Sequence, residues 1–127
     1  MKDKKYNVAV VGATGVVGEV IISLLHERDF PVGELHALAS EQSAGKKVMC
    51  GSKPIVVKDM TNFDFSGVDY AFFSAGNSVS KEYVAKATSA GALVIDNSSE
   101  FRYESDIPLI VPEVNPQALA EYRNRNI

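Results

Sequence analysis

Residues 8–21 read VAVVGATGVVGEVI, in which Gly12, Gly15 and Gly18 separate two apolar segments. The first segment, 7–11, is short and rich in valine, which is typical of a strand covered on both faces of a parallel sheet. The second, 16–27, has helical spacing, and we expect its apolar residues on one face: Val16, Val17, Val20, Ile21, Leu24 and Leu25. The stretch predicts a strand, a glycine turn and a helix.

The rest of the chain continues this alternation of strands and helices. Four further apolar runs are expected to form strands, at 34–39, 54–57, 70–73 and 93–95. A loop is expected from 40 to 53 and a connection at 63–68. Strands that alternate with helices indicate an α/β fold with a doubly wound, mainly parallel sheet.

Capping residues indicate where the other helices begin and end. Ser78 or Ser80 is suited to cap a helix that runs to about Ala90, and Gly91 then takes the position of a glycine just past the helix end. In the tail, Asn115 is followed by a proline, the expected N-cap and first residue of another helix.

The segments that follow the predicted strands hold most of the unusual sequence. These segments are 12–18, 40–46, 74–76 and 96–102. Because ligands bind to doubly wound sheets at the carboxyl ends of the strands, we expect the functional residues to gather at that edge.

The glycine loop has the pattern G-x-x-G-x-x-G, with Ala13 at the second glycine of the G-x-G-x-x-G fingerprint. Glycine permits a positive φ and a close approach of backbone to a pyrophosphate, and Gly18 lets the helix pack closely on the sheet. Free N–H groups and the helix dipole favour an anion. The loop predicts a dinucleotide site; the alternative is a tight turn that binds nothing.

The segment after the second strand bears on the choice between NAD and NADP. An NAD site usually has an acidic residue here for the ribose 2′-hydroxyl, whereas this strand ends at Ser40. A small hydroxyl leaves room for a 2′-phosphate, with Ser43 and Lys46 nearby to bind it. Glu41 opposes this unless its carboxylate points away. We predict NADP as the cofactor, with NAD as the alternative.

Composition and charge argue against several classes of protein. Of the 127 residues, 46% are hydrophobic and 23% charged, as in an ordinary globular domain. The net charge of −3 disfavours a nucleic-acid or anionic membrane partner. No stretch approaches the roughly 18 apolar residues that span a bilayer. We expect a soluble, cytoplasmic protein with neither nucleic acid nor membrane as partner.

Few residues are suited to catalysis or metal binding. Cys50 is the single cysteine and lies among turn-forming residues, with no histidine paired to it, so we expect no nucleophilic role. His26 and His36 lack the close pairing of a metal site, and no metal is expected. Residues 43–46 are not a P-loop, because Lys47 stands where that motif has Ser or Thr.

Five motifs, in order, carry a family resemblance: GATGVVG, LASEQSAGK, FFSAG, DNSSEFR and VPEVN. Over almost the whole chain they resemble the amino-terminal part of aspartate-semialdehyde dehydrogenases. The resemblance implies that residues 1–127 form a Rossmann-like NAD(P)-binding domain of a longer two-domain enzyme. It implies reductive dephosphorylation of aspartyl phosphate to aspartate semialdehyde with NADPH, in lysine, threonine and methionine biosynthesis, by a homo-oligomeric parent protein that also binds phosphate.

The resemblance also implies site residues. Three segments would contact the cofactor: Gly12, Thr14, Gly15 and Val16 at the pyrophosphate, Ser40 and Ser43 near the adenosine 2′-phosphate, and Ser74, Ala75 and Gly76 along the nicotinamide half. Arg102 falls on the arginine that holds the substrate phosphate, for which a planar guanidinium is suited. The alternative is an exposed Arg102 paired with Glu100, Glu104 or Asp106.

Two features depart from the family pattern. Gln42 stands where the family often has arginine, which weakens the expected preference for NADP. The catalytic cysteine of the family, in an Asn-Cys-Ser/Thr context after VPEVN, has no counterpart in this sequence. We therefore expect no catalytic residue here and an inactive isolated chain.

Other functions remain open on the sequence. A relative of N-acetyl-glutamyl-phosphate reductase would share chemistry and cofactor, although 38–46 and 72–76 fit it less well. A non-catalytic NAD(P)-sensing module would need no catalytic cysteine. A structural domain with an empty glycine loop would bind no nucleotide.

Overall fold

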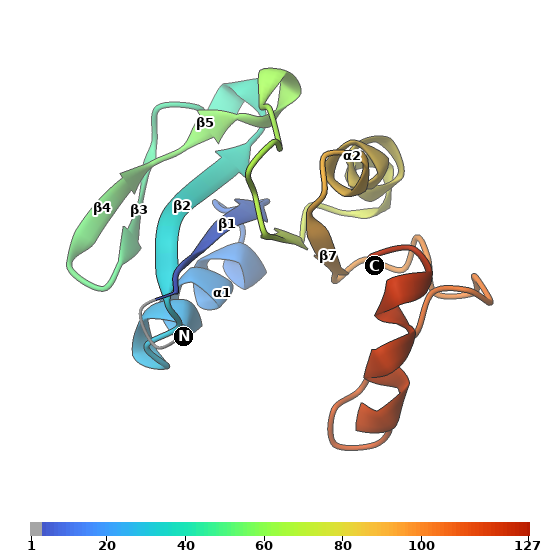
Figure 1. The fold of residues 1–127 in the computed structure, drawn as a ribbon. Helices are drawn as coiled ribbons and strands as arrows, with labels where there is room; N and C mark the ends of the chain where they lie inside the picture. The colour runs from blue at the N-terminus through green and yellow to red at the C-terminus, as the bar shows by residue number, and fades with distance from the viewer. Residues whose placement is uncertain (1–3) are drawn as a thin grey trace.

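The computed structural model describes residues 4–127, which are built on a five-stranded sheet in the order β5-β2-β1-β6-β7 (Figure 1). All neighbouring strands run parallel. The strands are β1 (Tyr6–Val11), β2 (Val32–Ala39), β5 (Lys58–Asp59), β6 (Tyr70–Phe73) and β7 (Leu93–Asp96). The predicted parallel α/β sheet is confirmed.

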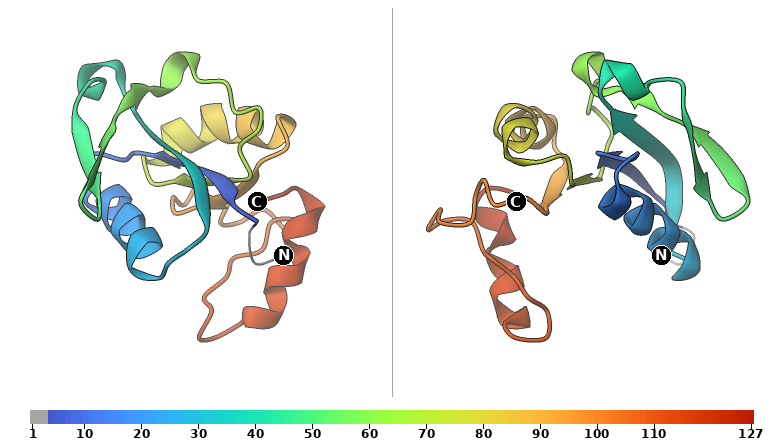
Figure 2. Two further views of the ribbon diagram at one scale, coloured as in Figure 1. Left: turned by 60° about the vertical axis from the view of Figure 1, so that its left-hand side comes forward. Right: turned by 180° about the vertical axis from the view of Figure 1, so that it is seen from behind.

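Two helices cover opposite faces of this sheet, α1 (Val16–Glu27) and α2 (Asn77–Ser89) (Figure 2). Alternate side chains of β1 point to the two faces. Val8 and Val10 pack in one core with Ile22 of α1, while Ala9 and Val11 pack in the other with Val84 of α2. A helix on each face makes the sheet doubly wound, and it explains why β1 is continuously apolar.

Most predicted elements are present with small shifts. The strand at 70–73 and the helix at 16–27 have the predicted bounds, whereas β2 begins two residues before the predicted 34. Gly91 follows α2 with φ +99°, as expected of a glycine just past a helix end. The tail helix is present as η3 (Pro116–Asn124), a 3₁₀ helix with Asn115 at its N-cap.

The loop predicted at 40–53 is wrong in its second half. After the short η1 (Glu41–Ser43), β3 (Lys47–Cys50) pairs antiparallel with β4 (Lys53–Val56). Gly51, with φ +62°, lies in the turn between them. Val48 is buried in the core with residues of α1, and Cys50 and Ile55 pack against the same core, so the hairpin is anchored there by apolar side chains of both strands.

The helical face predicted for α1 is also partly wrong. The buried residues are Gly18, Ile22 and Leu25, whereas Val16 and Val20 are 81% and 50% exposed. The helix turns the small Gly18 toward the sheet because its first turn lies against the glycine loop. Tertiary contact, rather than the count of apolar residues, decides which face is buried.

The predicted N-cap of α2, Ser78 or Ser80, is wrong as well. The helix begins at Asn77, and Gly76 is the N-cap with φ +94° and ψ 171°. Such a backbone is accessible essentially to glycine alone. Ser78 therefore lies inside the helix, and Ser80 is fully buried.

The chain between β5 and β6, and the chain after β7, is mostly irregular. A short η2 (Met60–Asn62) follows β5. The tail segment 97–115 has no helix or strand, and η3 lies to one side of the sheet in all three ribbon views (Figures 1 and 2). The N–H of Val94 in the edge strand β7 donates to the carbonyl of Asn126 at 2.8 Å, so the tail is hydrogen-bonded to β7. Within residues 4–127 no helix is long and apolar enough to cross a membrane.

Candidate functional site

The carboxyl ends of β1 and β6 meet where the strand order reverses. From β1 the chain continues to β2 on one side, and β6 lies on the other. In open α/β sheets this topological switch point opens the crevice in which ligands bind. Because the strands are parallel, segments 12–18, 40–46, 74–76 and 96–102 all lie at this edge, as predicted.

The glycine loop is packed tightly on two sides and open on the third. Gly12 has φ +92°, and a Cβ there would lie 2.8 Å from the carbonyl oxygen of Ser74. A Cβ at Gly18 would overlap the carbonyl oxygen of Gly12. Gly15 is exposed with φ −80°, and a Cβ there would make only an ordinary contact of 3.5 Å. The open side is therefore at Gly15.

The hydrogen bonds of the loop divide its N–H groups into two sets. The N–H groups of Gly12 and Ala13 donate to the carbonyl of Leu38 at 2.9 and 3.1 Å, which fixes the loop to the end of β2. Four others have no acceptor among residues 4–127, namely those of Thr14, Val16, Val17 and Gly18. Unpaired donors at the N-terminus of a 12-residue helix form an anion-binding arrangement.

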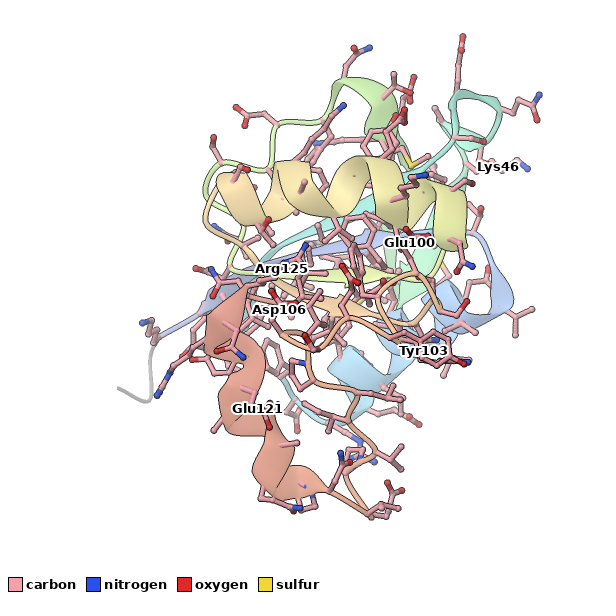
Figure 3. All side chains as sticks on the ribbon, turned by 90° about the vertical axis from the view of Figure 1, so that its right-hand side faces the viewer. Lys46, Glu100, Tyr103, Asp106, Glu121 and Arg125 are labelled. Carbon is pink, nitrogen blue, oxygen red and sulfur yellow. The ribbon has the colours of Figure 1, made fainter. Side chains whose placement is uncertain are left out.

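The segment after β2 turns sharply away from the sheet. Ser40 is the exposed N-cap of η1, and its carbonyl accepts the N–H of Ser43 at 2.9 Å. Lys46 is exposed, and Figure 3 shows it projecting outward. Glu41 and Gln42 are exposed too, so the carboxylate of Glu41 has solvent available to it.

The third segment is held against the glycine loop. The N–H and the hydroxyl of Ser74 both donate to the carbonyl of Val11, at 2.9 and 3.3 Å. Ala75 is half-buried and Gly76 is exposed at the start of α2. This segment and the glycine loop therefore form adjacent walls of the switch point.

The fourth segment presents an arginine without a carboxylate partner. Arg102 is exposed and forms no ion pair within residues 4–127. Glu104 and Asp106 pair instead with Arg125, at 3.5 and 3.3 Å, and Figure 3 shows Asp106 beside Arg125. Arg102 is exposed, as the alternative expected, but no ion pair joins it to Glu100, Glu104 or Asp106 among residues 4–127. With Asp96 at the end of β7, Arg102 lines a cavity of about 450 Å³.

Sequence reasoning located the loop at 96–102 but missed how it is held. Asp96 accepts hydrogen bonds from Ser80 and Ser98, and Asn77 bonds Ser99. An acidic residue directly after the apolar run 93–95 was the available signal. Nothing in the sequence indicated that its partner would come from the inside of α2.

The remaining candidate residues lie apart from this edge or lack reactive partners. Cys50 is half-buried at the end of β3. His36 lies on β2 against the ring of Phe63, with ring centroids 5.0 Å apart, and burial together with the charge of Lys58 lowers its pKa. Residues 4–127 contain no group of three His, Cys, Asp or Glu side chains that could hold a metal ion.

Residues 7–122 match the family described as semialdehyde dehydrogenase, NAD binding domain. The chain belongs to this family. The match covers the sheet, both main helices and the four segments at the switch point.

Relatives of known structure share both sequence and fold with the chain. Aspartate-semialdehyde dehydrogenase 2 of Vibrio cholerae is 53% identical over 124 residues, which cover 98% of this chain and 37% of that protein. This chain superposes on a crystal structure of the Vibrio cholerae enzyme complexed with ASA with a TM-score of 0.93. The match covers 98% of this chain and 40% of the chain in that structure. The chain therefore spans well under half the length of these relatives.

Two further solved structures differ in what they support. The Candida albicans aspartate semialdehyde dehydrogenase with NADP is 30% identical, with a TM-score of 0.77, and the match covers 92% of this chain and 36% of that one. RSP, a Rex-family repressor solved in complex with beta-NADH, has a TM-score of 0.61 at 15% identity, covering 95% of this chain and 60% of that one. The likeness to RSP concerns the fold alone.

Proposed function

We propose that this chain is the NADP-binding domain of an aspartate-semialdehyde dehydrogenase. The observation that carries the proposal is the set of N–H groups at 14 and 16–18, which have no acceptor in the described part of the chain and lie at the switch point of a parallel sheet. The family match and the 53% identity to the Vibrio cholerae enzyme favour this activity over other uses of such a site.

The residues of the loop fit a dinucleotide pyrophosphate. Gly12 and Gly18 are closed by backbone contacts, whereas Gly15 leaves space in front of the free donors. Thr14 and Val16 would hold the pyrophosphate through their backbone N–H groups at the N-terminus of α1. Gly15, whose own N–H donates to the carbonyl of Gly12, would lie against the pyrophosphate and leave room for it. When bound, NADP supplies the hydride acceptor or donor of the parent enzyme.

We assign the preference for NADP to the segment after β2. Ser40 directly follows β2 and Ser43 ends η1, with Lys46 exposed three residues later, so hydroxyls and one cation would receive the 2′-phosphate. A Ser40→Asp variant is expected to bind NADP more weakly and NAD no more weakly than the natural chain, because the added carboxylate repels phosphate and suits a 2′-hydroxyl. Titration of both nucleotides against both chains measures this shift, and an unchanged NADP to NAD ratio would place the 2′-phosphate elsewhere.

Ser74, Ala75 and Gly76 would border the nicotinamide half, and Arg102 would bind the phosphate of the substrate. Within residues 4–127 the guanidinium of Arg102 has no carboxylate partner, which supports this role, because such a bidentate donor is available to an anion. In the parent protein the substrates would be aspartyl phosphate, or aspartate semialdehyde and phosphate.

The proposal extends to the parent protein. Residues 1–127 would be one dinucleotide-binding domain of a longer two-domain, homo-oligomeric enzyme, as the resemblance implies. A cytoplasmic location, which the composition favours, belongs to the same proposal. The competing function is a nucleotide-sensing module, which shares the fold and would also bind NAD(P).

Titration of NADPH into the chain, followed by nicotinamide fluorescence, tests the nucleotide site. Gly15→Val is the informative variant, since its side chain would fill the open side of the loop while the backbone at Gly15 suits any residue. We expect saturable binding to the natural chain and at least about ten-fold weaker binding to the variant. Equal binding by the two chains, or none below about 1 mM to either, would contradict the proposal.

A further inference from the structure

A polar network at the end of β7 is not explained by the cofactor site. Its centre is the carboxylate of Asp96. One oxygen, Oδ1, accepts the hydroxyl of Ser80 at 2.8 Å and the N–H of Ser98 at 3.0 Å, and Oδ2 accepts the hydroxyl of Ser98 at 2.9 Å. Ser80 is fully buried within α2, so the carboxylate supplies the partner that a buried hydroxyl requires.

A second set of hydrogen bonds lies next to the first. Asn77 is the first residue of α2, and its Oδ1 accepts the N–H of Ser99 at 3.0 Å and the hydroxyl of Ser99 at 3.1 Å. Its Nδ2 donates to the same hydroxyl at 2.9 Å. Of two consecutive loop residues, Ser98 is thus hydrogen-bonded to the carboxylate of Asp96, which also accepts a hydrogen bond from α2. Ser99 is hydrogen-bonded directly to the first residue of α2.

The backbone of Arg102 depends on these bonded serines. The N–H of Arg102 donates to the carbonyl of Ser99 at 3.2 Å, and the N–H of Glu100 donates to the hydroxyl of Ser98 at 3.2 Å. Since Arg102 has no ion pair of its own within residues 4–127, its position is set by the loop. A long side chain on a loose loop loses more entropy when it binds an anion.

The same end of α2 also borders the nucleotide segment. The helix begins directly after Gly76, and Ser74 is bonded to the end of β1 beside the glycine loop. One rigid element therefore contacts both the segment proposed for the nicotinamide half and the loop that carries Arg102.

We propose that Asp96, Ser80 and Asn77 are positioning residues, which hold the loop of Arg102 at a fixed place beside the nucleotide site. They touch neither ligand and act through Ser98 and Ser99. The inference rests on the proposed role of Arg102 and names the residues on which that role depends.

Asn77→Ala tests the inference without opening the core, because Asn77 is exposed. Phosphate is titrated into the labelled chain while the side-chain Nε–H signal of Arg102 is followed by NMR, and NADP affinity is measured separately. We expect Asn77→Ala to weaken phosphate binding at Arg102 about two- to ten-fold, the equivalent of one or two lost hydrogen bonds, with NADP affinity nearly unchanged. Ser99→Ala should weaken phosphate binding similarly, and Ser99→Thr, which keeps the hydroxyl, should restore it.

Asn7→Ala is the matched control. The side chain of Asn7 accepts the N–H of Glu34 and donates to the carbonyl of Gly67, both at 3.0 Å, at the amino ends of the strands. The Asn7→Ala substitution should lower thermal stability and leave phosphate affinity unchanged. Phosphate binding by Asn77→Ala equal to that of the natural chain would overturn the inference while NADP binding still supports the proposed function. Absence of any phosphate response at Arg102 in the natural chain would overturn it too, and absence of NADP binding would instead refute the proposed function.

Discussion

At Gly18 a side chain of any size would overlap the carbonyl group of Gly12, whereas Gly15 has open space beside it. The glycines of one loop therefore serve different purposes. Gly12 and Gly18 let the loop, β6 and α1 approach one another. Gly15 keeps the space in front of the free N–H groups clear, where backbone can approach a ligand.

Substitution by alanine should separate these purposes. Gly18→Ala forces backbone to move and is expected to lower the free energy of unfolding by about 1–3 kcal/mol. Gly15→Ala should change it by less than about 0.5 kcal/mol, because its Cβ would meet nothing closer than 3.5 Å. Urea unfolding of the two variants measures both values, and equal losses would show that the loop is not packed in this way.

The pKa of His36 provides a prediction on pH. Burial and the charge of Lys58 lower it below 6.5, against the opposing effect of Glu34. The unfolded chain then binds a proton that the folded chain does not, so unfolding takes up a proton between the lowered pKa and 6.5. Stability rises with pH across that window and is lost as the pH falls through it.

His36→Gln removes this proton uptake. Urea unfolding between about pH 7.5 and about pH 5 should show a larger loss of stability on acidification in the natural chain than in the variant. Parallel curves for the two chains would mean that His36 titrates alike when folded and unfolded.

Whether Arg102 forms an ion pair could not be predicted from the neighbouring residues in the sequence. Three acids lie within four residues of it, and any of them was a reasonable partner. Two are instead bound by Arg125, which is 19 and 21 residues from Asp106 and Glu104. The motif gave the position of Arg102 in the loop, but the competition between arginines is settled by tertiary structure.

At the scale of the element, α1 has two apolar faces of unequal importance. Ile22 is fully buried against β1, whereas Val20 is 50% exposed. Ile22→Ala is expected to cost about 2–5 kcal/mol because it leaves a cavity. Val20→Ala should cost less than about 1 kcal/mol. Urea unfolding measures both, and a larger loss at Val20 would mean that the helix is rotated on the sheet.

Periodicity and glycine placement were sufficient to locate β1, β2, β4, β6, β7 and both main helices, but they missed the two-residue edge strand β5. They failed at β3, where Lys47 and Met49 are exposed and the short element depends on the single buried side chain of Val48. They also failed at the start of α2, where Gly76, and not a serine, is the N-cap because the turn from β6 needs a positive φ. In both cases the deciding contact is with residues distant in sequence.

At the scale of the whole molecule, strand order brings the separate motifs together. Four loops distant in sequence lie at one edge because all five strands of the main sheet run parallel. The sequence predicted this edge correctly, since alternation of strands and helices implies it. The network of Asp96 could not be predicted, because it joins the inside of α2 to the end of β7.

An amide NMR titration of the 127-residue chain with NADP tests the central claim most directly. We predict saturable shifts concentrated at Thr14 and 16–18, with further shifts at 40–46 and 74–76, since these segments share the edge. Amides at the amino ends of the strands, such as that of Asn7, should not respond. Shifts confined to the amino ends of the strands, or no shifts up to about 1 mM NADP, would contradict the account.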